Sequence, residues 1–204
     1  MLTEYAGLPF SDERRAGGPQ AIPGPVMCAY FDRGGEGVGY HTEAARNEGS
    51  GALNPADGSY LNEFRIDEPV GTTYTKTDID DTEFNAFDPE IGMLYVGWTA
   101  AGQWLNYTVE VARDGVYSLD VLYTAAEHGG AVSVAVDGED QTGPLELASM
   151  FDSRETLDWR QVHHWARSGP VAELRLGEGL HVLTLRIEVA GHLNLAKLEF
   201  RLVR

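Results

Sequence analysis

"GWTAAGQWLNYTVEVARDGVYSLDVLYTA", residues 97–125, decides the fold class of this chain. Apolar and polar side chains alternate over residues 104–111 and again over 117–124, and Arg113-Asp114-Gly115 lies between the two runs. Alternation with a period of two residues is typical of a strand with one buried face, and Asp-Gly is a frequent turn sequence. The stretch therefore predicts two strands joined by a tight turn. Their buried faces should include Tyr107, Tyr117 and Tyr123.

The same alternation recurs over residues 132–136, 183–188 and 198–202, with glycine-rich turns between the runs and no helical periodicity. Short strands at this spacing predict an all-β fold, an antiparallel two-sheet β-sandwich. Residues 1–21 are polar and rich in turn formers, so we expect an N-terminal arm or linker followed by one domain over 22–204. Trp104 shares the polar face of its strand, where it is expected to be exposed or covered by a loop.

The segment 34–92 differs from the rest of the chain because it is long, weakly periodic and rich in Gly, Asn and Asp. Long loops in a compact domain are usually functional or disordered. This one carries too many aromatic rings for disorder, so we expect a functional loop region. Its rings are Tyr40, Tyr60, Phe64, Tyr74, Phe84 and Phe87.

Composition excludes several classes of function. A net charge of −17, from 32 acidic and 15 basic residues, argues against nucleic-acid binding, which needs clustered cations. No apolar run is long enough to span a bilayer, and the N-terminus lacks the features of a signal peptide. Cys28 is the single cysteine, so an internal disulfide is impossible and a small core residue is the expected role.

Five blocks of sequence, in this order and spacing, resemble the family 6 carbohydrate-binding modules. The resemblance implies a β-sandwich jelly roll that binds a polysaccharide or oligosaccharide without catalysis, often beside a linked glycoside hydrolase domain. We therefore expect an extracellular or periplasmic location, with the signal peptide absent from this sequence. Residues 51–65 resemble a branch of the family with an enlarged loop region. The blocks are GGEGVGYH (34–41), VGWTAAGQWLNYTVEVARDGVYSLDV (96–121), LDWRQV (157–162), LGEGLHVLTLRI (176–187) and LNLAKLEF (193–200).

The resemblance also implies a cleft at the loop end of the sandwich, where two aromatic rings hold a sugar and an asparagine bonds its hydroxyls. Pyranose C–H faces stack on rings, and an amide both donates and accepts hydrogen bonds. The matching asparagine is Asn194. Phe64 or Tyr60 is expected as the first ring, with Tyr40 and His41 as further contacts to the glycan.

The position of the second ring departs from the family pattern, because Thr156 falls where a tryptophan is usual. Trp165 or Phe151 is expected to replace that ring, and Trp159 is expected in the core. The calcium site of the family is also altered, because Met27, Ala29 and Ala196 stand at three positions that usually hold carboxylates. Calcium needs about six to eight oxygen ligands, so we expect no metal or cofactor there. Asp78, Asp80 and Asp81 predict a solvated acidic turn.

Two other functions stay open at this point. Acidic residues are plentiful, so a carboxylate pair of a small glycoside hydrolase or lyase is possible, although no motif identifies one. The departures from the family pattern would also fit a structural interaction domain whose sugar site has decayed.

Overall fold

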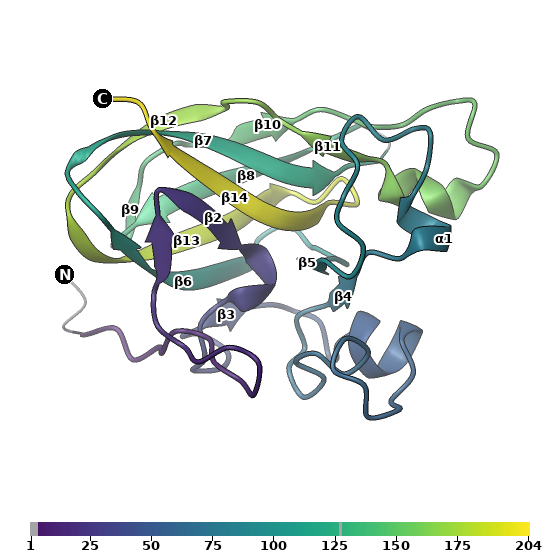
Figure 1. Cartoon of the computed structure of the whole chain (residues 1–204), viewed down its shortest axis with the longest axis horizontal. Coiled ribbons are helices and arrows are strands. Elements are labelled where there is room, and N and C mark those ends of the chain that lie inside the picture. Colours follow the sequence, from purple (N-terminus) through teal and green to yellow (C-terminus); the bar gives the residue numbers. More distant parts are fainter. Residues whose placement is uncertain (1–3, 127) are drawn as a thin grey trace.

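The computed structural model describes residues 4–126 and 128–204, and these residues form a sandwich of two sheets (Figure 1). The order of the first sheet is β1-β6-β13-β8-β10, with β3 beside β6 and β9 beside β8. Its strands are β1 (Gln20–Ile22), β3 (Tyr40–His41), β6 (Trp104–Val111), β8 (Gly130–Val136), β9 (Glu139–Asp140), β10 (Leu145–Leu147) and β13 (Gly179–Val189).

The second sheet has the order β11-β7-β14-β5-β4, with β12 beside β7 and β2 beside β14. Within the described residues, the pairing of strands is antiparallel except between β1 and β6. The predicted two-sheet β-sandwich is therefore confirmed. The strands are β2 (Gly24–Met27), β4 (Thr72–Tyr74), β5 (Leu94–Val96), β7 (Gly115–Thr124), β11 (Trp165–Arg167), β12 (Ala172–Leu176) and β14 (Asn194–Leu202).

Helical structure in the described residues is short. It consists of α1 (Thr77–Asp80), the 3-10 helices Cys28–Tyr30 and Asp158–His163, and an irregular helical turn at Gly49–Leu53. Helix α1 and the helix at Asp158–His163 lie together at one end of the sandwich (Figure 1). We call this end, where the loops that follow β5 and β13 also lie, the loop end.

The core lies between the two sheets and follows the alternation of the strands. The three tyrosines predicted to be interior, Tyr107, Tyr117 and Tyr123, are all buried, and so is Cys28. Full burial of one such large apolar side chain contributes about 1.5–3 kcal/mol to stability. The period-two pattern therefore identified the main core correctly.

The long 34–92 region is held in place by buried polar side chains as well as by rings. The Asn47 Oδ1 atom accepts hydrogen bonds from the backbone N–H groups of Gly49, Ser50 and Thr72, each at 3.0 Å. The Asn47 Nδ2 atom donates to Thr72 Oγ1 at 2.8 Å. One asparagine thus fixes the segment at residues 47–50 against β4.

The expectation of an N-terminal arm or linker needs correction for part of its length. Residues 20–22 form β1 within the first sheet, and Leu8 pairs with Arg33. Phe10 is buried and stacks on Tyr30, with a distance of 5.2 Å between ring centroids. An apolar ring and a strand edge bind this segment to the sandwich, while the domain boundary at residue 22 itself stays a prediction.

Candidate functional site

A pocket at the loop end brings together residues from four separate segments, and we call it the loop-end pocket. Its volume is about 280 Å³. Tyr95 comes from β5, Asn194 is the first residue of β14, and His192 lies in the turn between β13 and β14. The lining residues are Leu53, Tyr95, Trp98, Thr99, Val162, His163, His192 and Asn194.

Trp98 provides the open aromatic surface of this pocket. Its side chain is 45% exposed, and its backbone has a φ of 51°. Side-chain-bearing residues rarely adopt this left-handed conformation, and such strain is often found at functional sites. Two glycines seat the ring on the backbone, because a Cβ at Gly49 or Gly71 would lie 2.8 or 3.0 Å from a ring carbon of Trp98. The indole is therefore fixed in place while part of it stays open.

Asn194 provides amide chemistry beside that ring. The side chain is 8% exposed, and its Nδ2 atom donates to the carbonyl of Val162 at 2.6 Å. Among the described residues no donor bonds its Oδ1 atom, so an acceptor remains for a ligand hydroxyl. This is the one predicted site residue that lies in the loop-end pocket.

His163 adds a second polar group, oriented by a buried carboxylate. Its Nδ1 atom lies 3.0 Å from Asp80 Oδ1, and Asp80 is buried. A carboxylate on Nδ1 holds the proton on that nitrogen and leaves Nε2 as the free ring nitrogen. The backbone N–H of Lys76 also donates to Asp80, at 2.7 Å. The predicted solvated turn is therefore wrong at Asp80, which positions a histidine of the pocket.

The second predicted stacking ring, Trp165, is fully buried and offers no face to a ligand. Its Nε1–H donates to Asp80 Oδ1 at 2.7 Å, and its ring packs edge-on against Tyr95 with centroids 5.1 Å apart. The prediction for Trp165 is corrected: this ring supports Asp80 and Tyr95 from behind. Trp159, predicted to be in the core, is 52% exposed instead and lies edge-on to His163.

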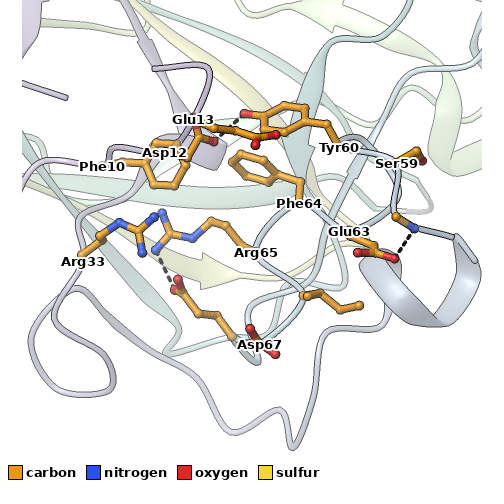
Figure 2. A pocket seen from close by; sticks show the side chains of 13 residues that line it. Phe10, Asp12, Glu13, Arg33, Ser59, Tyr60, Glu63, Phe64, Arg65 and Asp67 are labelled. Carbon is orange, nitrogen blue, oxygen red and sulfur yellow. Dashed lines mark hydrogen bonds and ion pairs between the residues drawn. The ribbon is translucent and has the colours of Figure 1, made fainter. Parts of the chain in front are cut away.

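Phe64 and Tyr60 lie in a different pocket, between the N-terminal segment and residues 58–68, with a volume of about 360 Å³ (Figure 2). Phe64 is only 2% exposed and contacts the rings of Phe10, Tyr30 and Tyr60. A ring enclosed by three others cannot stack on a sugar. The stacking role predicted for Phe64 is therefore corrected to a packing role.

Some of the polar groups of this second pocket are paired with one another (Figure 2). Tyr60 donates its hydroxyl to Asp12 Oδ2 at 2.7 Å, and burial together with this carboxylate raises the pKa of Tyr60. The buried Arg65 guanidinium pairs with Glu68 at 2.6 Å. Burial lowers the pKa of Arg65, while Glu68 acts against that shift. The Tyr60–Asp12 bond joins the enlarged loop to the N-terminal segment, and the Arg65–Glu68 pair lies within the loop.

Tyr40 and His41 do not line the loop-end pocket either. Tyr40 is buried in the main core and packs edge-on against Phe31, so the glycan contact expected from it is corrected to a packing role. His41 stands opposite Trp104 in the β3–β6 pairing, and its Nδ1 atom lies 2.5 Å from Glu36 Oε1. Trp104 is half-buried and lines a hollow on the first sheet. Neither His41 nor Trp104 therefore belongs to the predicted cleft at the loop end.

At the altered calcium site, apolar side chains surround two of the three positions that usually hold carboxylates. Ala29 and Ala196 are both buried, Ala29 beside Phe10 and Phe64, and Ala196 beside Trp165. No group of three or more His, Cys, Asp or Glu side chains suited to a metal occurs within residues 4–126 and 128–204. That no metal or cofactor binds stays a prediction.

Trp98 is the most important pocket residue that was not predicted from the sequence. Its signal was a tryptophan between Gly97 and Thr99, in the loop before the strand at 104–111 rather than in the strand's alternation. Tyr95, Val162, His163 and His192 carried no comparable local signal.

The fold is shared with carbohydrate-binding modules of known structure. The family 6 module CsCBM6-3 from Clostridium stercorarium, solved with cellobiose, aligns with a TM-score of 0.55 and 11% identity, over 92% of this chain and 100% of that chain. A β-1,3-glucan-binding family 6 module from Bacillus halodurans aligns with a TM-score of 0.52 and 14% identity, over 90% of this chain and 99% of that chain.

A larger enzyme contains a similar domain. It is a glycoside hydrolase family 43 arabinoxylan arabinofuranohydrolase from Bacillus subtilis, solved with cellotetraose, and it aligns with a TM-score of 0.53 and 13% identity. The match covers 93% of this chain and 30% of that chain. No protein-family profile and no curated protein matches the chain. At these identities the similarity establishes the fold: this chain has the β-sandwich fold of the family 6 modules.

Proposed function

We propose that this chain is a carbohydrate-binding module of family 6 that binds a glycan without catalysis, through the loop-end pocket. One observation carries the proposal: the exposed indole of Trp98 stands beside Asn194 and His163 in one pocket. An open ring face stacks on the C–H face of a pyranose. The amide and the imidazole nitrogen hydrogen-bond the hydroxyls at its rim.

The partner expected in a longer protein is a glycoside hydrolase domain, as in the Bacillus subtilis enzyme named above. Binding to a polysaccharide would raise the local concentration of such a domain at its substrate. This role fits an extracellular or periplasmic location. Within the described residues, no helix is both long enough and apolar enough to cross a bilayer.

The test combines a glycan array with a reducing-sugar assay on each glycan that binds. We expect binding with a Kd on the order of 10 μM to 1 mM and no release of reducing ends. Asn194→Ala should weaken binding about five- to thirtyfold, because a buried hydroxyl of the sugar would lose its partner. Release of reducing ends would instead indicate an enzyme, and an empty array would favour a structural interaction domain.

A further inference from the structure

A second hollow lies directly beyond Trp98 and shares a wall with the loop-end pocket. We call it the outer hollow; it is a shallow, open depression, less enclosed than the loop-end pocket. Trp98 and Leu53 line both spaces. Leu53 is mostly exposed although it is a large apolar side chain, and Trp98 is nearly half exposed. The other lining residues are Arg46, Glu48, Gly51 and Ala52.

The loop that forms the outer hollow is fixed at both ends by buried asparagines. Asn47 bonds three backbone N–H groups, as described above, and Asn54 donates its Nδ2–H to Thr73 Oγ1 at 2.9 Å. Lys76 Nζ donates to Asn54 Oδ1, also at 2.9 Å. These bonds attach residues 47 and 54 to β4 and the segment after it, so the hollow is preorganised and ligand binding need not order the loop.

The charges in the outer hollow balance each other. Arg46 Nε and Nη2 donate to the two carboxylate oxygens of Glu48, each at 3.0 Å. Such a paired fork has no net charge, yet its Nη1–H groups and the remaining oxygen lone pairs can still bond hydroxyls. With a net charge of −17 on the chain, an anionic sugar would be repelled and a neutral one accepted.

From this geometry we infer that the loop-end pocket and the outer hollow are adjacent subsites for one neutral oligosaccharide, which passes over the shared wall of Trp98 and Leu53. The inference rests on the proposed function and deepens it. We therefore expect a disaccharide to be the shortest ligand that reaches both spaces. Uronic-acid and sulfated glycans are disfavoured, because Glu48 already occupies the guanidinium that would bind their charges.

The experiment uses an array of neutral β-glucan, β-xylan and β-mannan oligosaccharides with uronic-acid and sulfated counterparts. Calorimetry then follows with the mono-, di- and trisaccharide of the best-binding neutral series. We expect the disaccharide to bind on the order of tenfold more tightly than the monosaccharide. Equal affinities for the two, or tighter binding of the anionic series, would overturn the inference and leave the proposed function standing. An array without any binding would remove both.

Two variants locate the second subsite. Ala52→Trp should fill the outer hollow and abolish the tenfold gain of the disaccharide while the affinity for the monosaccharide changes less than twofold. Ala112→Trp is the matched control, since Ala112 is also exposed but lies in the turn after β6. If Ala52→Trp keeps the gain, the second sugar lies elsewhere and the inference is wrong.

Glu48→Gln tests the charge argument, because it leaves Arg46 without its carboxylate partner. We expect the affinity for the uronic-acid series to rise at least threefold, whereas the neutral disaccharide binds the same or more weakly. The control is Glu173→Gln, which removes a comparable exposed partner from Arg204 (3.1 Å in the parent) outside the site. No rise with Glu48→Gln, or the same rise in the control, would overturn the selectivity for neutral glycans.

Discussion

Two aromatic groups of this protein look alike in the sequence but differ in what covers them. Around Phe64 the rings pack against one another in edge-on and tilted arrangements, and arginines lie over ring faces of the group, such as Arg14 at 4.1 Å from the centroid of Tyr60. At the loop end Trp98 rests on glycine backbone, and no arginine or lysine lies over it among the described residues. An aromatic-rich segment is therefore a poor guide to ligand binding, because the uncovered face is what a sugar needs.

Removal of the central covered ring should have the largest effect on stability. Phe64→Ala should lower the free energy of unfolding by about 3–5 kcal/mol, because it leaves a cavity among Phe10, Tyr30 and Tyr60. Denaturant unfolding measures this loss. Glycan binding by the fraction that remains folded should equal that of the parent. A stable Phe64→Ala protein with lost binding would restore Phe64 as a ligand residue.

The reverse result is expected for the uncovered ring. Trp98→Ala should weaken glycan binding by about 1–2 kcal/mol, five- to thirtyfold, through the loss of stacking. Its effect on unfolding should be about 1 kcal/mol or less, since the side chain is half exposed and its backbone is strained. Calorimetry and denaturant unfolding on the same preparation measure both. Trp104→Ala is the control, and unchanged binding by Trp98→Ala would disprove the loop-end pocket as the site.

Calcium should have the smallest effect on stability. Ala29 packs within the covered group around Phe64, and Ala196 packs against Trp165 behind the pocket, so apolar contacts occupy two positions where the resemblance expects ligands. A micromolar site would add roughly 4 kcal/mol in millimolar calcium. We expect the same Tm in chelator and in millimolar calcium. A rise of several degrees would reveal a calcium site formed by other residues.

Much of the fold could be predicted because its signals are local. Alternation along the strand at 104–111 placed Tyr107 in the core, and the turn residues marked where the strands end. The site was harder to predict. Asn194 was found through its place in a resembling block, whereas Trp165 and Phe64 were chosen as rings near expected positions and are both buried. Asp80 shows the cause plainly: its partner Trp165 lies 85 residues away in the sequence.

Period-two alternation reports which face of each strand avoids water, so the sequence was enough to predict a two-sheet sandwich and its core strands. The asparagine at the loop end was predicted instead from the resemblance to the family 6 modules. Only the tertiary structure decided which rings remain open. Whether a loop ring is covered depends on segments distant in sequence. Phe10 of the N-terminal segment packs against Phe64, and Trp165 donates a hydrogen bond to Asp80. Trp98 stays open because a left-handed backbone and the glycines at 49 and 71 seat it at the surface, and no local pattern of residues records that arrangement.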